Sequence, residues 1–530
     1  MLIIRDVRME LNDSFESIKN KVISKYRLQN VTLFEYAKKS VDARNKNDVF
    51  FVASFYVECK NESKVKNKKI SVFDKRKYRP TLIKEKYDYD KKVVVVGAGP
   101  CGLFAALNLV LKGFKVTLIE QGKMIEERIK DVENLLNSSV LNPFSNIQFG
   151  EGGAGTFSDG KLQTTINDEH ILYMIEEFIN NGANDDLRYL SKPHIGTDVL
   201  RKVIVNIRNK IISLGGEVLF EHKLVDLDII DNSIKGIKVL HNDEIKYIET
   251  NNVFLAIGHS ARDTFKLLKD LDVPLEQKPF SMGVRIEHLQ ENINKAQYGE
   301  KFYKHPALKA ADYKLSVHLD NGRGVYTFCM CPGGEVVASS SEEGGVVVNG
   351  MSNYARDGKY SNSAVLVNIL TSDFESDDVL AGVELQRKYE KKAYEMSNKY
   401  YAVAQTVGDF LNDSSTTYLK NGTSYKPNVV FGNIKDVVPS YVYESLKEAL
   451  PLLDKKLKGF ADNDSLLLGV ETRSSSPVRI VRNKNYESIK IKGLYPLGEG
   501  AGYAGGITTS AVDGMKAVEA FIENNKFKKV

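Results

Sequence analysis

The stretch "VVVVGAGPCGLFAALNLVLKGFKVTLIEQG", residues 93–122, decides the fold of this chain. Its four consecutive valines are typical of a strand that is buried on both faces of a parallel sheet. A glycine-rich turn and an apolar segment of helical length follow, and a second apolar run ends on Glu120. Strand, turn, helix and strand in this order form a βαβ unit, which predicts an α/β protein.

The turn in this unit matches the spacing G-x-G-x-x-G at Gly97, Gly99 and Gly102. The first glycine permits the tight turn, the second lets a pyrophosphate approach, and the third lets the helix pack against the strand. Glu120 ends the second strand, where an acid accepts ribose hydroxyls and disfavours the 2′-phosphate of NADP. We therefore predict a dinucleotide site; the alternative is a glycine-rich βαβ unit without a ligand. The neighbours that we include in the predicted site are Pro100, Cys101 and Gln121.

Length and composition indicate a globular protein of several domains. The chain has 530 residues, of which 42% are hydrophobic and 27% charged, and a length of this kind favours two to four domains. It contains no run of about 18 apolar residues and no apolar signal core at its start, so we expect no membrane span. Four cysteines are too few for a disulfide framework in so long a chain. We expect a reduced, cytoplasmic protein.

Positive charge is concentrated in residues 60–92, which contain 13 basic and 5 acidic residues, whereas the whole chain carries a net charge of +5. The remainder of the chain is therefore slightly acidic. One interpretation of the basic segment is a solvated linker. The other is an electrostatic handle for an anionic partner, such as nucleic acid or lipid headgroups.

Changes of pattern along the chain divide it into parts. The start contains a strand at residues 1–9, a helix capped by Ser14, and further strands. Residues 378–411 have the spacing of a long helix. The predicted parts are a small α+β domain (1–59), a basic linker (60–90), the first part of a nucleotide-binding domain (91–263), a mixed α+β substrate domain (264–465), and the last part of the nucleotide-binding domain (466–530).

Two segments far from the opening turn favour FAD over NAD as the dinucleotide. "NNVFLAIGHSA" resembles the segment that closes the FAD domain of glutathione-reductase-like flavoproteins, with Gly258 as its glycine. "LYPLGEGAGYAGGITTSAVDGMKA" resembles their terminal flavin-binding segment, in which an acid, here Glu499, lies near the ribityl chain or the pyrophosphate. The helix that follows would direct its N-terminus at the flavin. The residues implied by this second segment are Gly498, Glu499, Gly505, Gly506 and Ile507.

From residue 91 to its end, the chain resembles the bacterial family of FAD-dependent dehydrogenases often labelled "NAD(FAD)-utilizing dehydrogenase". The segments that carry the resemblance are "NIQFGEGGAGTFSDGKL", "KPHIGTD", "GHSARDTF", "FSMGVRIEH", "AADYKL", "FCMCPGGEVVASSSEEGGVVVNGMS", "GVETRSSSPV" and "GEGAGYAGGI", with "KKSVDARNK" in the leading domain. The resemblance implies a glutathione-reductase-type, Rossmann-like FAD domain with an inserted substrate domain. It also implies redox activity, without an established substrate.

The glycine-rich loop 149–162 corresponds to a loop that wraps the flavin and pyrophosphate in this superfamily. The residues that we expect to contact the cofactor are Gly153, Thr156, Ser158 and Lys161; the alternative is a flexible loop. Lys161 is a candidate for the flavin N5 position, for the pyrophosphate or for a structural role. Val225 has a backbone position suited to adenine, or is an ordinary strand valine. Arg128 reaches the pyrophosphate, or lies on a solvated helix face.

Cys329 and Cys331 are two residues apart on a predicted strand. Since no other cysteine or histidine lies nearby, we expect no metal site. We expect the two cysteines to be small buried residues near the substrate pocket, with a redox thiol pair as the alternative. Cys101 is interpreted as a small filler in the phosphate turn.

Polar residues in apolar or turn settings are the candidates for catalysis or substrate binding. They are His259, Arg285, His288, Tyr313, Lys314 and Arg473. A structural role is the alternative for each one. We assign no general acid or base.

The leading hypothesis is an FAD-dependent oxidoreductase that transfers hydride between the flavin and a small organic substrate. We expect no separate Rossmann domain for a nicotinamide cofactor, so NADH or NADPH would enter the active site only transiently, or electrons would come from a partner or from the substrate itself. One alternative is an RNA-acting flavoprotein that modifies tRNA and binds it through the N-terminal domain and basic linker. Another is a flavin-binding protein without catalytic activity. The substrate and the oligomeric state stay open.

Overall fold

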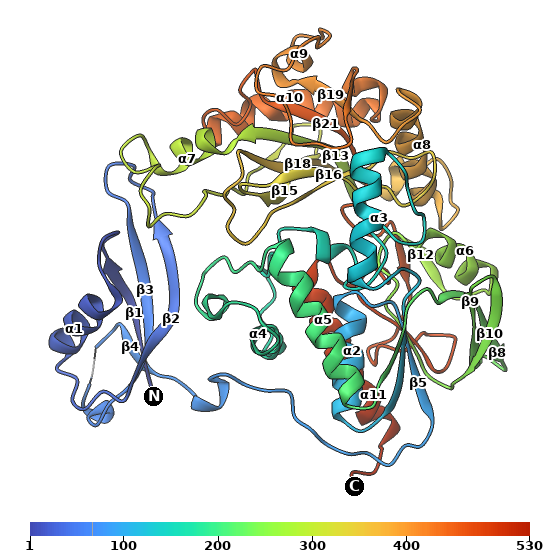
Figure 1. Ribbon diagram of the computed structural model, residues 1–530, viewed down its shortest axis with the longest axis horizontal. Helices are drawn as coiled ribbons and strands as arrows, with labels where there is room; N and C mark the ends of the chain where they lie inside the picture. Colours follow the sequence, from blue (N-terminus) through green and yellow to red (C-terminus); the bar gives the residue numbers. More distant parts are fainter. Residues whose placement is uncertain (66) are drawn as a thin grey trace.

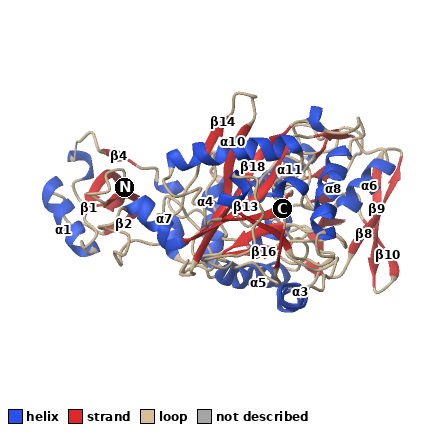
Figure 2. Cartoon of the chain, turned by 90° about the horizontal axis from the view of Figure 1, so that it is seen from above, coloured by secondary structure: helices blue, strands red, loops and turns tan. Residues whose placement is uncertain are grey.

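The computed structural model describes residues 1–65 and 67–530. The molecule is elongated, with the N-terminal domain at one end and the strands β8–β10 at the other (Figure 2). Between them lie a parallel-sheet domain and a larger, mostly antiparallel sheet, one above the other in Figure 1.

The N-terminal domain is a four-stranded sheet in the order β2-β3-β1-β4 with one helix. Ser14 caps that helix as predicted, because its hydroxyl accepts a hydrogen bond from the Ser17 amide at 3.1 Å. The elements are β1 (Leu2–Met9), α1 (Phe15–Tyr26), β2 (Leu33–Asp42), β3 (Phe50–Glu58) and β4 (Ile70–Val72). Strand β4 comes from the basic segment, so the sheet extends beyond the predicted boundary at residue 59.

The basic segment 60–90 is not a free linker over its length. Beyond β4 it runs along the parallel-sheet domain, where the Glu85 amide donates to the Leu111 carbonyl at 3.0 Å and the Asp88 amide to the Lys528 carbonyl at 2.9 Å. The N-terminal domain also contacts the body of the protein directly, through a 2.6 Å hydrogen bond from the Lys39 amide to the Tyr189 carbonyl. A tether is therefore not its only connection.

The parallel sheet has the strand order β23-β11-β5-β6-β7. The chain adds strands on one side of β5 and then returns to its other side, so the strand order reverses next to β5. Ligands of open α/β sheets bind at the carboxyl ends of the strands at this kind of switch point. The strands are β5 (Lys92–Val96), β6 (Lys115–Ile119), β7 (Glu217–Leu219), β11 (Val253–Leu255) and β23 (Leu494–Pro496).

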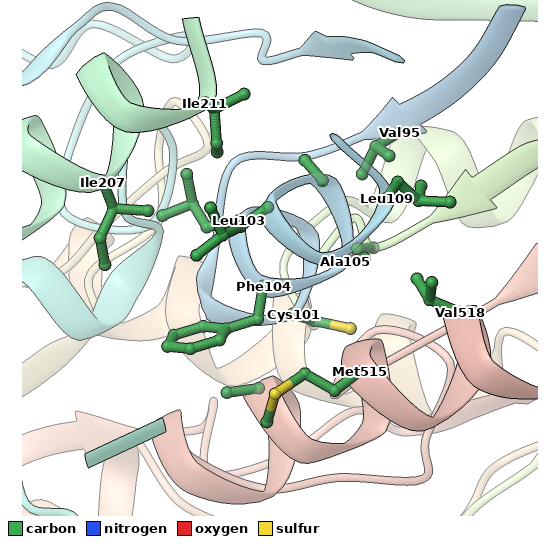
Figure 3. Close-up of a cluster of buried hydrophobic side chains, with 14 of the residues drawn as sticks. Val95, Cys101, Leu103, Phe104, Ala105, Leu109, Ile207, Ile211, Met515 and Val518 are labelled. Carbon is green, nitrogen blue, oxygen red and sulfur yellow. The ribbon is translucent and has the colours of Figure 1, made fainter. Parts of the chain in front are cut away.

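Helices cover one face of the parallel sheet and a β-meander covers the other (Figure 1). In Figure 3, Leu103 of the central helix lies towards Ile207 and Ile211 of one neighbour, while Met515 and Val518 of the other neighbour lie on a different side. The helices are α2 (Pro100–Leu111), α3 (Ile125–Ser138), α4 (His170–Asn180), α5 (Thr197–Ser213) and α11 (Ile507–Asn525). On the other face are β8 (Lys223–Ile230), β9 (Ser233–His241), β10 (Glu244–Glu249), α6 (Arg262–Asp270), β12 (Leu275–Gln277) and β22 (Val478–Ile480).

The larger domain is built on a seven-stranded sheet in the order β14-β15-β18-β13-β21-β19-β20. Its strands are β13 (Phe280–Leu289), β14 (Ser316–His318), β15 (Gly324–Cys331), β18 (Tyr360–Ile369), β19 (Ala402–Thr406), β20 (Val429–Phe431) and β21 (Leu466–Glu471). A hairpin of β16 (Glu335–Ala338) and β17 (Val348–Met351) is added, together with α7 (Gln290–Tyr298), α8 (Ala381–Glu395), α9 (Val407–Leu411) and α10 (Ser440–Lys456).

The larger sheet differs from the sequence prediction in two places. The predicted helix 378–411 is divided into α8, β19 and α9, because the segment 402–406 pairs with β21; tertiary pairing overrides local propensity there. The sheet also includes β21, which ends at Glu471, beyond the predicted domain boundary at 465.

Candidate functional site

The opening glycine turn has the geometry that the motif requires. Gly97 has φ +99°, and a Cβ added to it would lie 2.3 Å from the Ala256 carbonyl oxygen. A Cβ on Gly102 would lie 1.8 Å from the Gly97 carbonyl oxygen, so only glycine allows this approach of helix to strand. Gly99 is different, because a Cβ there would meet only the Gly153 Cα, at 3.9 Å. The space in front of the α2 N-terminus is therefore open.

Segments that are distant in sequence meet this turn at the carboxyl ends of the strands. A Cβ on Gly153 would lie 3.0 Å from the Gly99 Cα, and one on Gly155 would lie 3.0 Å from Ile507. A Cβ on Gly500 would lie 2.6 Å from the Gly258 carbonyl oxygen. The structure thus brings together the opening turn, the loop 149–162, Gly258 and the start of α11.

Open space lies beside three of the predicted glycines. A Cβ added to Gly258, Gly505 or Gly506 would meet no atom within 4 Å. Gly506 is the N-cap of α11, whose first amides have no helical carbonyl partner. An open region bounded by glycines and by the amide ends of two helices suits a negatively charged, extended ligand.

Glu120 lies at the end of β6, as predicted, but its carboxylate is not free. It accepts hydrogen bonds from the amides of Ala98 (2.8 Å), Gly122 (3.0 Å) and Gly150 (2.9 Å). The side chain therefore connects the glycine turn to the loop 149–162. A carboxylate has about four acceptor positions, so the three bonds leave room for a ribose hydroxyl.

Arg128 occupies neither of its two predicted positions, the pyrophosphate or a solvated helix face. It is completely buried. Its guanidinium donates to the carbonyls of Asn146 (2.8 Å), Ile147 (2.9 Å), Glu151 (2.6 Å) and Gly153 (3.0 Å). Arg128 therefore holds the backbone of the glycine-rich loop through its carbonyls. The spacing of residues along a helix does not reveal this role.

The loop is stabilised further by its own side chains. The Thr156 hydroxyl donates to the Glu151 carbonyl at 3.1 Å, and the Ser158 hydroxyl donates to the Gly155 carbonyl at 2.7 Å. Two guanidinium groups lie over the Phe157 ring, with Arg128 at 4.8 Å and Arg201 at 4.4 Å from its centre. These contacts stabilise the conformation of the loop.

A pocket of about 550 Å³ lies next to Gln121 at the end of β6. Its walls come from the loop before Gly150, the start of β8, α6 and the segment 341–345. Side chains that line it include Gln121, Phe144, Phe149, Lys223, Ser260 and Arg262. Val225 lies two residues beyond Lys223 on β8 and is partly buried; it is absent from the lining of this pocket.

Arg473 belongs to a buried ion-pair network between the two large domains. Glu390 on α8 accepts hydrogen bonds from Arg473 at 2.8 Å and from Arg262 at 2.7 Å, and all three side chains are buried. The two guanidinium groups lower the pKa of Glu390 despite its burial. Arg473 is therefore held by protein groups, and a role in substrate binding would have to break this network.

His259 lies beside that network, and its Nδ1 is 3.0 Å from the Ser260 hydroxyl. Burial, with Arg473 and Arg262 nearby, lowers its pKa to about 3. The imidazole is therefore neutral near pH 7, which excludes it as a resting proton donor in its cationic form.

The buried candidates in the larger domain are held by other residues of that domain. His288 is buried, with its ring nitrogens 3.2 Å from the Ser465 hydroxyl and 3.1 Å from the Tyr313 hydroxyl. Burial lowers the pKa of His288 to about 3 and raises that of Tyr313. Lys314 is exposed. Arg285 is completely buried and forms a two-point ion pair with Glu471.

Lys161 and Glu499 occupy the end of the crevice that faces the larger sheet. The Lys161 ammonium donates to the Met330 carbonyl on β15. Burial raises the pKa of Glu499 to about 7, while nearby Lys278 opposes the rise. The sequence analysis did not select Lys278 as a site residue. Burial lowers the pKa of its ammonium.

Three other polar residues near the crevice were not singled out from sequence. Asp159 and Arg356 form a buried ion pair, and His194 is buried beside them with its pKa lowered to about 4, chiefly by burial. His194 lies in the quoted segment "KPHIGTD", so the motif itself was the available signal. Among the described residues, no group of three or more His, Cys, Asp or Glu side chains has metal-binding geometry.

No helix within residues 1–65 and 67–530 is both long enough and apolar enough to cross a bilayer. All four cysteines are free: Cys59, Cys101, Cys329 and Cys331.

Comparison with known proteins identifies relatives of both the whole chain and its larger domain. Residues 279–474 match the family model described as FAD-dependent protein, C-terminal domain-like. An uncharacterised protein of Clostridium beijerinckii is 44% identical over 529 residues, which cover 98% of each chain.

Two solved structures show low similarity to the chain. Glycerol-3-phosphate dehydrogenase of Bacillus halodurans, complexed with FAD, is 11% identical with a TM-score of 0.35, and the match covers 84% of this chain but only 66% of that one. Glycine oxidase of Bacillus cereus is 12% identical with a TM-score of 0.34, and the match covers 82% and 96% of the two chains.

Fold and site together define an α/β protein whose parallel sheet carries a dinucleotide-binding type of glycine turn. The chain belongs to the same family as the Clostridium beijerinckii protein, and its larger domain matches the family model for FAD-dependent proteins.

Proposed function

We propose that the chain is an FAD-dependent oxidoreductase and that FAD lies in the crevice at the carboxyl ends of β5, β6, β11 and β23. The observation that carries the proposal is the meeting of three glycine-bearing segments, 97–102, 149–162 and 498–507, around open space at Gly258, Gly505 and Gly506. A strand–turn–helix unit by itself would serve NAD equally well. The second helix N-terminus, contributed by the segment before α11, favours the flavin dinucleotide, because its amides would stabilise the negative charge of a reduced flavin ring.

The two ends of the crevice suit the two halves of FAD. Glu120 and the pocket beside Gln121 provide an acid for ribose and a cavity with aromatic walls for adenine. The α11 N-terminus, Lys161 and Glu499 lie at the other end, against β15 of the larger sheet. The isoalloxazine ring would therefore lie between the two large domains, where a small organic substrate can approach it from the sheet.

When bound, the flavin supplies a two-electron acceptor and donor for hydride transfer. The residues of the chain position it and control charge around it. The free amides of α11 stabilise negative charge at the pyrimidine edge. The Lys161 ammonium adds positive charge at the same end. The Glu499 carboxyl, with its pKa near 7, holds or releases a proton at neutral pH. The buried network around Glu390 fixes the domains that enclose the substrate and exclude water.

The electron donor in this proposal is NADH or NADPH, entering the active site transiently. Anaerobic addition of each nucleotide to the FAD-loaded protein tests this, because the donor bleaches the flavin absorbance and the other nucleotide bleaches it slowly or not at all. The full chain would also be tested for retention of RNA at low salt, which the tRNA-modification alternative requires. Retained RNA would favour that alternative.

The FAD site is tested with Gly505→Val. A Cβ added at this position would meet no protein atom within 4 Å, so the apoprotein should keep its thermal stability. The added methyl groups project into the proposed flavin position, so FAD affinity should fall by more than about tenfold. The FAD affinity of Gly505→Ala should lie between those of the wild type and Gly505→Val. Visible absorbance and FAD titration give the affinities. A wild-type protein that is colourless and takes up no added FAD refutes the proposal.

A further inference from the structure

Cys329 and Cys331 lie in an irregular part of β15, at the proposed flavin end of the crevice. Phe328 pairs with Ala364 of β18 and Cys331 pairs with Asn362, so one extra residue is present on β15. Cys329 itself has φ +42°, in the left-handed region that side chains other than glycine rarely adopt. A bulge of this type re-aims a side chain and is common next to active sites.

Arg285 holds this bulge in place. All five of its N–H groups are bonded: to both Glu471 oxygens, to the Asn362 and Asn349 side-chain oxygens, and to the Cys329 carbonyl at 3.1 Å. The Cys331 thiol donates to the same Cys329 carbonyl at 3.3 Å. The two cysteines are therefore fixed next to each other by a buried side chain that has no donor left for a substrate.

The two thiols differ in access. Cys331 is completely buried, whereas Cys329 is partly exposed and follows Phe328, whose side chain is 43% exposed. The thiol hydrogen bond from Cys331, together with Arg285 and Lys161, lowers the pKa of Cys329 to about 7, while the pKa of Cys331 is raised. One reachable thiol of low pKa beside one protected thiol is the arrangement of an attacking and a resolving cysteine.

The thiol pair lies close to the groups proposed to surround the flavin. Lys161, from the glycine-rich loop, donates to the carbonyl of Met330, the residue between the two cysteines. The charge of Cys329 contributes to the raised pKa of Glu499, from the segment before α11. The pair thus faces the crevice from the side of the larger sheet.

We propose that Cys329 and Cys331 form a two-electron dithiol–disulfide couple that passes electrons from the reduced flavin to an external disulfide; this inference rests on the proposed function. The Cys329 thiolate attacks the external disulfide and releases one thiol as the mixed disulfide forms. The Cys331 thiol then attacks the Cys329 sulfur, and the second external thiol leaves. The resulting Cys329–Cys331 bond is cleaved when the reduced flavin supplies two electrons and solvent supplies the protons, which restores both thiols and oxidised FAD.

Reductive titration of the FAD-loaded, air-oxidised protein tests the couple. With dithionite under anaerobic conditions, the wild type should take up about four electrons per FAD, two for each couple. Cys329→Ser and Cys331→Ser should take up about two. Cys59→Ser, in the N-terminal domain, is the matched control and should behave as the wild type does. The loaded protein and its nicotinamide donor should also reduce the model disulfide 5,5′-dithiobis(2-nitrobenzoate). This rate should fall more than tenfold in Cys329→Ser and in Cys331→Ser, and it should stay unchanged in Cys59→Ser.

A count of free thiols in denaturant gives a readout that does not need the flavin. After mild oxidation with diamide, the wild type should show two fewer free thiols than after reduction, and peptide mass spectrometry should locate the bond between residues 329 and 331. Four free thiols after oxidation, or uptake of only two electrons by the wild type, overturns the inference. A chain that forms the bond but binds no FAD refutes the proposed function and the electron transfer, while the dithiol pair itself stands.

Discussion

Replacement of Arg128 tests whether hydrogen bonds from this single side chain hold the glycine-rich loop in place. The change Arg128→Met keeps an unbranched side chain of similar length in the buried space but removes every N–H donor. Four carbonyls lose an N–H donor. Those of Glu151 and Gly153 keep a hydrogen bond from Thr156, whereas those of Asn146 and Ile147 are left unpaired among the described residues. Each buried acceptor without a donor costs about 1–3 kcal/mol. With two acceptors left unpaired, we expect a loss of roughly 2–6 kcal/mol in unfolding free energy.

The chain offers a matched control, because a second arginine contacts the same aromatic ring. Arg201 lies 4.4 Å from the centre of the Phe157 ring, and its Nε has no hydrogen-bond partner among the described residues. Arg201→Met therefore removes a cation–π contact of about 0.5–2 kcal/mol, without unpairing any of the four carbonyls. The difference between the two variants isolates the loop clamp.

Urea unfolding of the apoproteins, followed by far-UV circular dichroism because the chain has no tryptophan, measures the stabilities. FAD titration measures the second consequence, since a loosened loop should weaken binding by more than about tenfold, or about 1.4 kcal/mol. If Arg128→Met lies within about 1 kcal/mol of Arg201→Met and keeps the wild-type FAD affinity, the clamp is not what fixes the loop.

Two further predictions concern buried carboxyl groups. Glu390→Gln leaves Arg262 and Arg473 without their shared anion and should lower the unfolding free energy by about 3–5 kcal/mol, whereas exposed Glu343→Gln should change it by less than about 0.5 kcal/mol; equal urea midpoints would contradict this. Glu499 has a folded-state pKa of about 7 against an ordinary value of 4.5, so the folded apoprotein binds more protons between these values and loses stability as the pH rises through that window. Glu499→Gln should remove this component, seen as a shallower fall of unfolding free energy from pH 5 to 7, and an unchanged slope would refute the assignment.

The parts of the fold that local pattern determines were predictable. The βαβ unit rests on a valine run, a glycine spacing and a terminal acid that all lie within 30 residues, and the structure contains it as β5, α2 and β6. The Ser14 cap is equally local. The segment 402–406 was misassigned as helix because its partner, β21, lies some 60 residues further along the chain. The basic segment was expected to be a linker for the same reason, because β4 gains its partner only from β1.

The candidate polar residues divide in a similar way. Gly97, Gly99 and Gly102 have roles that follow from spacing, since turn geometry is a property of consecutive residues. Nothing in the local sequence distinguishes Arg128, Arg285 and Arg473 from other polar residues. Each of these side chains is hydrogen-bonded to buried partners from other segments. Whether an arginine is free to bind a ligand depends on how many of its five N–H groups the fold has already used. That number is not encoded in its neighbours along the chain.

The sequence by itself determined the parallel βαβ core, the glycine turn and the acid beside it, because strand burial, backbone freedom and helix direction are local properties. Only the tertiary structure decided how the crevice is completed. It placed Gly258 and the start of α11 beside the glycine turn, although α11 begins roughly 400 residues further along the chain. It also placed Cys329 and Cys331 next to Lys161. These arrangements depend on strand order and on the packing of two domains, which minimise buried unpaired charge and exposed apolar surface across the whole molecule.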